Sequence, residues 1–154
     1  MRTVHSLATL AMLAMLATPS ARAAAQAPAL KWGPAPAVLP AGAKMAVLQG
    51  DPGKAEPFTV RLDMPDGYRV APHFHPTDEH LTIIQGTLLL GMGDKVDRAR
   101  TTALPAGAFA SALANMHHYV TAKGHTVVQI QSMGTFMLTY VDKAALVAAI
   151  RAAG

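Results

Sequence analysis

The chain has no cysteine among its 154 residues, and charged side chains make up only 14% of it. Without cysteine, disulfide scaffolds, thiol catalysis and thiolate metal sites are all excluded. The 13 basic and 9 acidic residues are scattered, so the formal net charge of +4 comes from no basic cluster of the kind that contacts nucleic acid. We therefore expect no nucleic-acid partner.

Long apolar runs are also missing, apart from one near the N-terminus. Arg2 precedes an apolar segment at residues 7–17, and small residues follow at Ala21 and Ala23. This order is typical of a secretory signal peptide, and the apolar segment is shorter than the roughly 20 residues of a membrane-spanning helix. We predict that residues 1–23 are a signal peptide. The mature chain is then periplasmic or secreted, with no membrane partner after cleavage.

What the sequence does hold is a group of metal-ligand residue types. His73 and His75 are two residues apart, so on a strand both imidazoles point to the same face. Glu79 follows a Pro-Thr-Asp run that favours a bend and can bring the carboxylate beside the imidazoles. Three such ligands predict a site for a divalent first-row metal that has room for a further donor. No serine nucleophile motif and no glycine-rich phosphate loop competes with this interpretation.

The candidates for that further donor are His117 and His118. Adjacent residues on a strand face opposite sides, so both cannot enter the same pocket. His80 and His125 are not expected to be ligands. His80 follows Glu79 and faces away from it, and His125 lies beside a turn glycine.

The rest of the chain alternates short β-rich segments with turns. Residues 24–43 are rich in alanine and proline and are expected to form an extended arm. The expected strands are 44–48, 58–64, 81–84, 87–92, 116–121, 126–131 and 135–141. Segments 81–84 and 87–92 form either a hairpin or one sharply bent strand. Asp142 can cap an alanine-rich helix at residues 142–154. The pattern predicts an all-β sandwich or barrel with one terminal helix.

Counting register from the candidate ligands predicts which side chains face inward. The expected inward residues are Leu81, Ile83, Met116 and Val120, with Phe58, Val60 and Leu62 as further lining. The pocket around the metal is therefore expected to be apolar.

The segment 67–86 resembles the first motif of the cupin superfamily, G-x5-H-x-H-x3-E-x6-G, at every fixed position. The matching residues are Gly67, His73, His75, Glu79 and Gly86. A second segment resembles the second motif, G-x5-P-x-G-x2-H-x3-N, at Gly107 and His118. The other family positions hold Leu113, Asn115 and Ala122. Asparagine tolerates the left-handed backbone that a turn glycine supplies, so the turn at residue 115 can still form.

The resemblance covers residues 44–141 and implies the double-stranded β-helix, or jelly-roll barrel, of the small single-domain (type-2) cupins. It favours His118 over His117 and implies that His73, His75, Glu79 and His118 hold one divalent transition metal. The metal is iron, manganese, copper, nickel or zinc. Glu79 is also the candidate catalytic residue, either as a permanent ligand or as a base that leaves the ion. Homodimerisation is a further expectation from the family.

Three neutral imidazoles and one carboxylate leave a divalent ion with one positive charge and an octahedral ion with two free positions. A small organic substrate can bind there through two oxygens. We expect an exported metal-dependent enzyme, either an oxidoreductase of the dioxygenase type or a catalyst of metal-assisted proton transfer. The alternative is a non-catalytic module that binds a metal or a small ligand, because no second acid or base is evident. A transcription-factor sensor is disfavoured by the signal peptide and by the lack of a DNA-reading segment.

Overall fold

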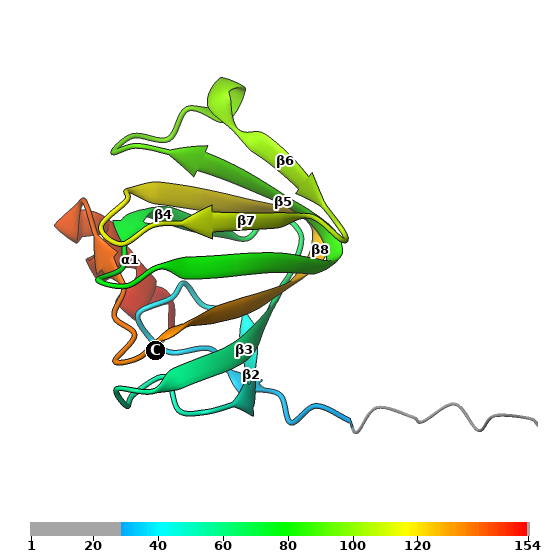
Figure 1. Cartoon of the computed structure of the whole chain (residues 1–154). Coiled ribbons are helices and arrows are strands. Elements are labelled where there is room, and N and C mark those ends of the chain that lie inside the picture. Colours follow the sequence, from blue (N-terminus) through cyan, green and yellow to red (C-terminus); the bar gives the residue numbers. More distant parts are fainter. Residues whose placement is uncertain (1–28, 154) are drawn as a thin grey trace, which may run out of the picture.

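The computed structural model describes residues 29–153, so the predicted signal peptide at residues 1–23 lies outside the described residues. Nine antiparallel strands form one strongly curled sheet (Figure 1). The elements are β1 (Gly33–Pro34), β2 (Lys44–Gln49), β3 (Pro57–Met64), β4 (Arg69–Phe74), β5 (Glu79–Met92), the 3-10 turn η1 (Arg98–Arg100), β6 (Thr102–Pro105), β7 (Phe109–Ala112), β8 (His118–Met133), β9 (Thr139–Tyr140) and helix α1 (Lys143–Ala153). The predicted fold class, a double-stranded β-helix with a short C-terminal helix, is confirmed.

Strands β5 and β8 form the centre of the sheet. They pair along almost their whole length, from Glu79 opposite Ser132 to Met92 opposite His118. Residues 81–92 are therefore a bent strand and not a hairpin. The register shifts twice between Ile83 and Thr87, and the second shift spans Gly86, whose φ is 74°. A side chain there would collide with the backbone of the neighbouring strand, so only glycine allows the two strands to approach at the bend.

Two predictions about strand boundaries were wrong. Residues 116–121 and 126–131 are not separate strands, because the ladder with β5 continues through the expected turn, where Lys123 lies opposite Thr87. Gly124, with φ 73°, bends the strand without reversing it. The expected strand at 135–141 is reduced to β9, because residues 134–138 form a loop in which the Phe136 N–H donates to the Pro52 carbonyl (2.8 Å).

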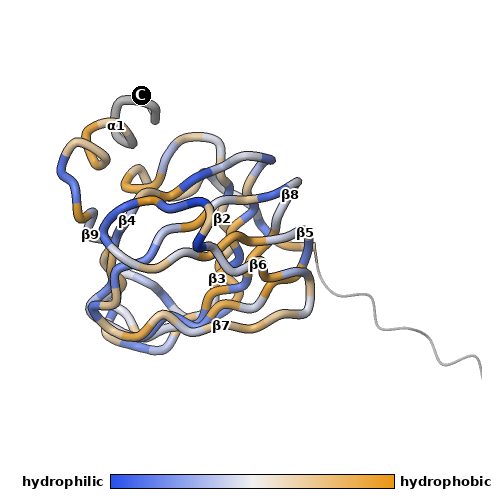
Figure 2. Tube along the Cα trace, turned by 90° about the horizontal axis from the view of Figure 1, so that it is seen from above, coloured by the Kyte–Doolittle hydropathy of each residue, from blue (hydrophilic) through white to orange (hydrophobic). Residues whose placement is uncertain are grey.

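The core fills the inside of the curled sheet. Leu81 and Ile83 are buried as predicted, and each fully buried aliphatic side chain contributes about 1.5–3 kcal/mol. Met116 was predicted wrongly, since it lies in the turn before β8, where strand alternation does not apply, and is 36% exposed. Figure 2 shows apolar and polar stretches succeeding one another along the strands, as expected for a sheet with one buried face.

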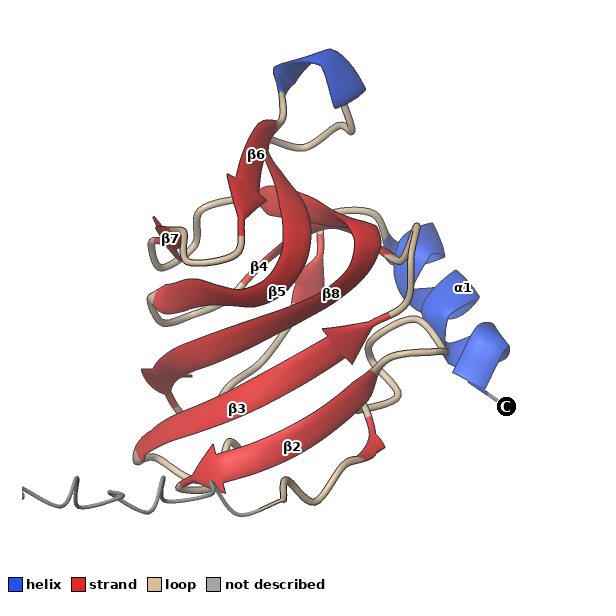
Figure 3. Cartoon of the chain, turned by 90° about the vertical axis from the view of Figure 1, so that its right-hand side faces the viewer, coloured by secondary structure: helices blue, strands red, loops and turns tan. Residues whose placement is uncertain are grey.

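The two ends of the described chain pack against this sheet. Gly33 and Pro34 pair with Met45 and Lys44 of β2. At the other end the Asp142 carboxylate accepts the Ala144 N–H (2.8 Å) and caps α1, which lies outside the sheet (Figure 3). Among residues 29–153, no helix is long and apolar enough to cross a membrane.

Candidate metal centre

Three segments of the curled sheet bring the four predicted ligands together. His73 on β4 and His118 at the start of β8 are cross-strand partners, so their side chains share a face. His75 follows the end of β4, and Glu79 is the first residue of β5. The turn before His118 is tied to this group because the Asn115 N–H donates to the His75 carbonyl (2.8 Å). Asn115 adopts the left-handed conformation, φ 62°, as expected for a residue in place of a turn glycine.

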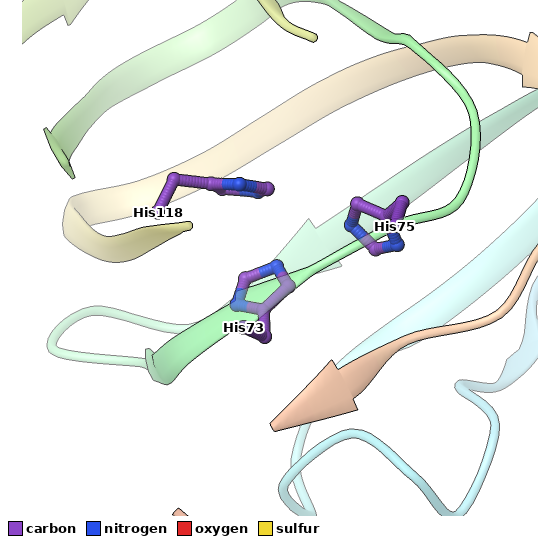
Figure 4. A group of neighbouring side chains, drawn as sticks. All are labelled: His73, His75 and His118. Atoms are coloured by element: carbon purple, nitrogen blue, oxygen red, sulfur yellow. The ribbon is translucent and has the colours of Figure 1, made fainter. Parts of the chain in front are cut away.

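The three imidazoles converge on one point inside the barrel (Figure 4). One ring nitrogen of each of His73, His75 and His118 lies within 4.8 Å of the other two. All three side chains are buried, at 4%, 3% and 1% exposure. Imidazoles gathered this closely away from water need a compensating partner, which a cation supplies.

Hydrogen bonds fix which nitrogen of each ring faces the cavity. The Nδ1 atoms of His73, His75 and His118 lie 2.8, 2.8 and 3.0 Å from the carbonyl oxygens of Ala71, Met137 and Met116. A carbonyl oxygen only accepts, so each Nδ1 carries a proton and donates it. In a neutral ring Nε2 is then a lone pair directed into the cavity. Metal-binding histidines are typically oriented by such a bond from the other ring nitrogen.

A second observation tests whether a metal fits these residues. Among the described residues, His75 Nε2 is buried and has no hydrogen-bond partner. A buried polar atom without a partner is uncommon in folded proteins, and it is costly unless a further group occupies the site. A divalent ion among the three Nε2 atoms would satisfy this lone pair.

Glu79 places a carboxylate oxygen beside two of these three histidines. Its Oε2 lies 3.3 Å from His118 Nε2 and 3.6 Å from His75 Nε2, and the side chain is buried. Two donors about 2.1 Å from one ion and roughly at right angles are about 3 Å apart, so this spacing suits shared coordination. The residues present therefore fit a first-row divalent ion.

Burial and mutual charge set the protonation states of the group without an ion. Burial and the charge of His118 lower the pKa of His73 to about 3, and burial likewise lowers the pKa of His75. Burial alone would raise the pKa of Glu79, but the hydrogen bond from His118 and the nearby imidazoles outweigh it and lower this pKa. Burial alone would lower the pKa of His118, but the Glu79 carboxylate outweighs it and raises this pKa. Without an ion, the carboxylate form of Glu79 and the protonated form of His118 therefore stabilise each other.

The other three histidines of the described chain lie away from the cavity. His117 Nδ1 is 2.6 Å from Asp94 Oδ1, and its ring stacks on Phe74 outside the barrel wall. His80 Nδ1 lies 2.9 Å from Ser111 Oγ. His125 Nε2 lies 2.6 Å from Asp63 Oδ1. Of the adjacent pair His117 and His118, the structure brings only His118 to the other candidate ligands.

The space beside the four residues is small and apolar. It is a cavity of about 70 Å³, and apart from His73, His75, Glu79 and His118 its lining is hydrophobic. The hydrophobic lining includes Leu39, Leu62, Leu81, Val120, Phe136 and Leu138. The cavity can therefore hold only a small, largely apolar molecule next to the ligands.

Four methionines of the described chain are exposed to solvent. They are Met92 (48% exposed), Met116 (36%), Met133 (47%) and Met137 (58%). Met92 lies opposite His118, and the main-chain carbonyls of Met116 and Met137 accept hydrogen bonds from the His118 and His75 rings. None of the four lines the cavity.

Sequence reasoning missed the groups that orient the ligands. Ala71 and Met116 each precede a ligand histidine by two residues, a local relation that the sequence does contain. Met137 is 62 residues from His75, and Phe136 stacks on the His75 ring with centroids 4.2 Å apart. No local pattern indicates that residues 134–138 fold over this histidine.

Comparisons with known proteins agree with the fold and say less about the chemistry. Among solved structures, a candidate acetylacetone dioxygenase from Methylibium petroleiphilum PM1 is similar with a TM-score of 0.59 and 20% identity, covering 75% of this chain and 78% of the other. The polyketide cyclase RemF from Streptomyces resistomycificus is similar with a TM-score of 0.55 and 14% identity, covering 65% and 71%. A cupin superfamily protein from Desulfitobacterium hafniense DCB-2 has a TM-score of 0.51 and 15% identity, covering 60% and 77%.

Identities this low establish the cupin fold and not the reaction. No curated protein matches the chain. One family model, described as a domain of unknown function and named DUF4437, matches residues 21–139, which is more than half of the chain. The chain thus has the cupin fold and belongs to the DUF4437 family.

Proposed function

We propose that this protein is an exported, mononuclear metal-dependent enzyme that acts on a small organic substrate through its oxygen atoms. The observation that carries the proposal is the convergence of one ring nitrogen from each of three buried imidazoles, among which His75 Nε2 has no hydrogen-bond partner. His73, His75, His118 and Glu79 are the proposed ligands. When bound, a redox-active first-row ion supplies Lewis acidity and a means of engaging dioxygen.

Hydrogen bonds, pKa shifts and the apolar lining around the proposed ligands support a role for each of them. The carbonyls of Ala71, Met116 and Met137 hold the imidazoles in the tautomer that leaves Nε2 free. The lowered pKa of Glu79 keeps the carboxylate ionised. In that state Glu79 is a ligand, and if it leaves the ion it can accept a proton from an enolisable substrate. The apolar lining of the cavity excludes bulk water from this proton transfer.

The cavity favours a particular class of substrate. Its volume of about 70 Å³ and hydrophobic lining suit a compact molecule with a few carbon atoms beside the coordinating oxygens. A β-diketone or its enolate has this shape and can present two oxygens to one ion. The similar structure of a candidate acetylacetone dioxygenase adds support by analogy of fold alone.

The alternative function is a non-catalytic module that binds a metal or a small ligand. It is favoured by one observation, the absence of a further acid or base in the described cavity lining once Glu79 and the histidines serve as ligands. This alternative predicts the same metal content but no turnover.

Oxygen consumption by the metal-loaded protein separates the two functions. The protein is loaded in turn with Fe(II), Mn(II), Cu(II), Ni(II) and Zn(II) and tested with β-diketones, catechols, flavonols and thiols. We expect oxygen uptake with one redox-active ion and a β-diketone, and none after Glu79→Gln. Asp78→Asn is the matched control, because the Asp78 carboxylate only accepts the Ala114 N–H (2.7 Å). A fully loaded protein without turnover on any member of the panel would favour the binding module.

Export and homodimerisation are parts of the same proposal. The mass of the protein purified from its native compartment should correspond to a chain that starts near residue 24. Sedimentation equilibrium at micromolar concentration should give twice the chain mass. A full-length monomer would contradict both.

A further inference from the structure

A groove outside the barrel has the features of a second binding site. It has a volume of about 390 Å³, within the range of small-molecule sites, and none of the four proposed metal ligands lines it. Its floor is formed by β4 and β8 around Ala71 and Thr121, and its walls by η1 with the preceding loop and by α1. We call it the β4–α1 groove.

The charges of the groove all have one sign. Arg69 and Arg98 are its only charged lining residues, and most of the other lining is apolar. Among residues 29–148, whose side chains are described, no carboxylate lies within 4 Å of either guanidinium. The adjacent Arg100 differs, because its Nε lies 3.5 Å from Asp97 Oδ2 and it does not line the groove.

The wall that carries Arg98 is held firmly in place. The Tyr119 hydroxyl donates to the Asp97 carbonyl (2.8 Å) and accepts the Asp97 N–H (2.9 Å), which fixes the start of η1 on β8. The Tyr119 side chain is 2% exposed and packs where Gly91 has no side chain. On the opposite wall, α1 contributes only Ala145 and Ala148, whose small side chains leave the groove open.

We propose that the β4–α1 groove binds an organic carboxylate with a short apolar body, at a site separate from the metal centre. Arginine recognises carboxylates through paired N–H groups, and two arginines without acidic partners supply the complementary charge. The apolar body is accommodated by Val96, Ala145 and Ala148. Inorganic phosphate satisfies the arginines but leaves these apolar walls uncovered.

The test is an NMR titration of the full mature protein with hexanoate, reading the amide signals of Thr121 and Ala145. Three further probes each lack a feature of hexanoate. Hexanamide lacks the charge, acetate lacks the apolar body, and inorganic phosphate lacks both the carboxylate geometry and the apolar body. We expect saturable binding of hexanoate, at least about tenfold weaker after Arg69→Gln or Arg98→Gln. Arg100→Gln should leave the dissociation constant unchanged, and each of the three other probes should bind at least about tenfold more weakly than hexanoate.

Several outcomes would overturn the proposal. They are equal binding of hexanoate and hexanamide, equal effects of all three arginine substitutions, phosphate binding as tight as hexanoate, and no saturable shift at Thr121 or Ala145. Ala148→Phe fills the groove without changing its charge and should abolish binding, and its thermal unfolding checks that the fold is kept. Metal content is unaffected by any of these variants, so failure here is distinct from failure of the proposed metal site.

Discussion

Each of the three cavity histidines has one ring nitrogen committed to a backbone carbonyl and the other directed inward. This arrangement leaves the inward nitrogen of each neutral ring free to bind a cation. Burial holds the pKa of His73 near 3, so this ring stays neutral and ready to coordinate. His118 is the exception, because Glu79 raises its pKa above the ordinary value of 6.5 in the absence of an ion.

The opposite pKa directions of His73 and His118 predict how metal affinity depends on pH. Below the raised pKa of His118 the metal-free site carries a proton that must leave before an ion binds, so affinity falls as pH falls. The apparent dissociation constant should rise about tenfold for each unit by which the pH falls below the pKa of His118, and it should be constant above that pKa. Calorimetric titration with Co(II) in buffers of different ionisation enthalpy should show release of about one proton in the sloping range. An affinity that is constant from about pH 5.5 to 8.5 would contradict the protonated His118.

The loop at residues 134–138 is the element that closes the site over His75. Phe136 stacks on the His75 ring, and Met137 contributes its main-chain carbonyl. Phe136→Ala should therefore weaken metal binding several-fold by freeing the ring. Met137→Leu should leave it unchanged, because the substitution keeps the carbonyl. Competition titrations against a chromophoric chelator measure both, and equal effects of the two substitutions would contradict this role of the loop.

The bend of β5 depends on Gly86, and a matched glycine is available in the same chain. Gly67 and Gly86 share a φ of 74°, but a Cβ at Gly67 meets nothing within 4 Å, whereas one at Gly86 would lie 2.9 Å from Thr126 Cα and closer still to the His125 carbonyl. Gly67→Ala should cost about 1–2 kcal/mol of unfolding free energy for the left-handed backbone. Gly86→Ala should cost about 1–3 kcal/mol more, because β8 must move. Urea unfolding of the two variants tests this difference, which should disappear if close strand approach is unimportant.

At the scale of the whole molecule, the sequence predicted the fold through local patterns. The period-two strands predicted an all-β sandwich or barrel. The resemblance of Gly67, His73, His75, Glu79 and Gly86 to the first cupin motif implied which barrel it is and which residues gather in it. The continuity of β8 through Gly124 was not predictable, because it depends on a ladder to Thr87 and Leu88 that lies far away in sequence. Long-range contacts of this kind also place Phe136 on His75.

The surface was the hardest part to predict. Methionines usually fill gaps in a core, and Met64 does so, but Met92, Met116, Met133 and Met137 are exposed. Arg69 and Arg98 are 29 positions apart, and only the docking of η1 on Tyr119 brings them to one groove. Neither feature follows from composition or periodicity.

The central claim is that one ion is held by His73, His75, Glu79 and His118. Its most direct test is the metal content, by elemental analysis, of the mature protein from its native compartment and of two single variants. We expect about one first-row ion per chain in the wild type, the same in His117→Ala, and almost none in His118→Ala, with unchanged circular dichroism in all three. Equal metal content in the wild type and in His118→Ala would contradict the ligand set.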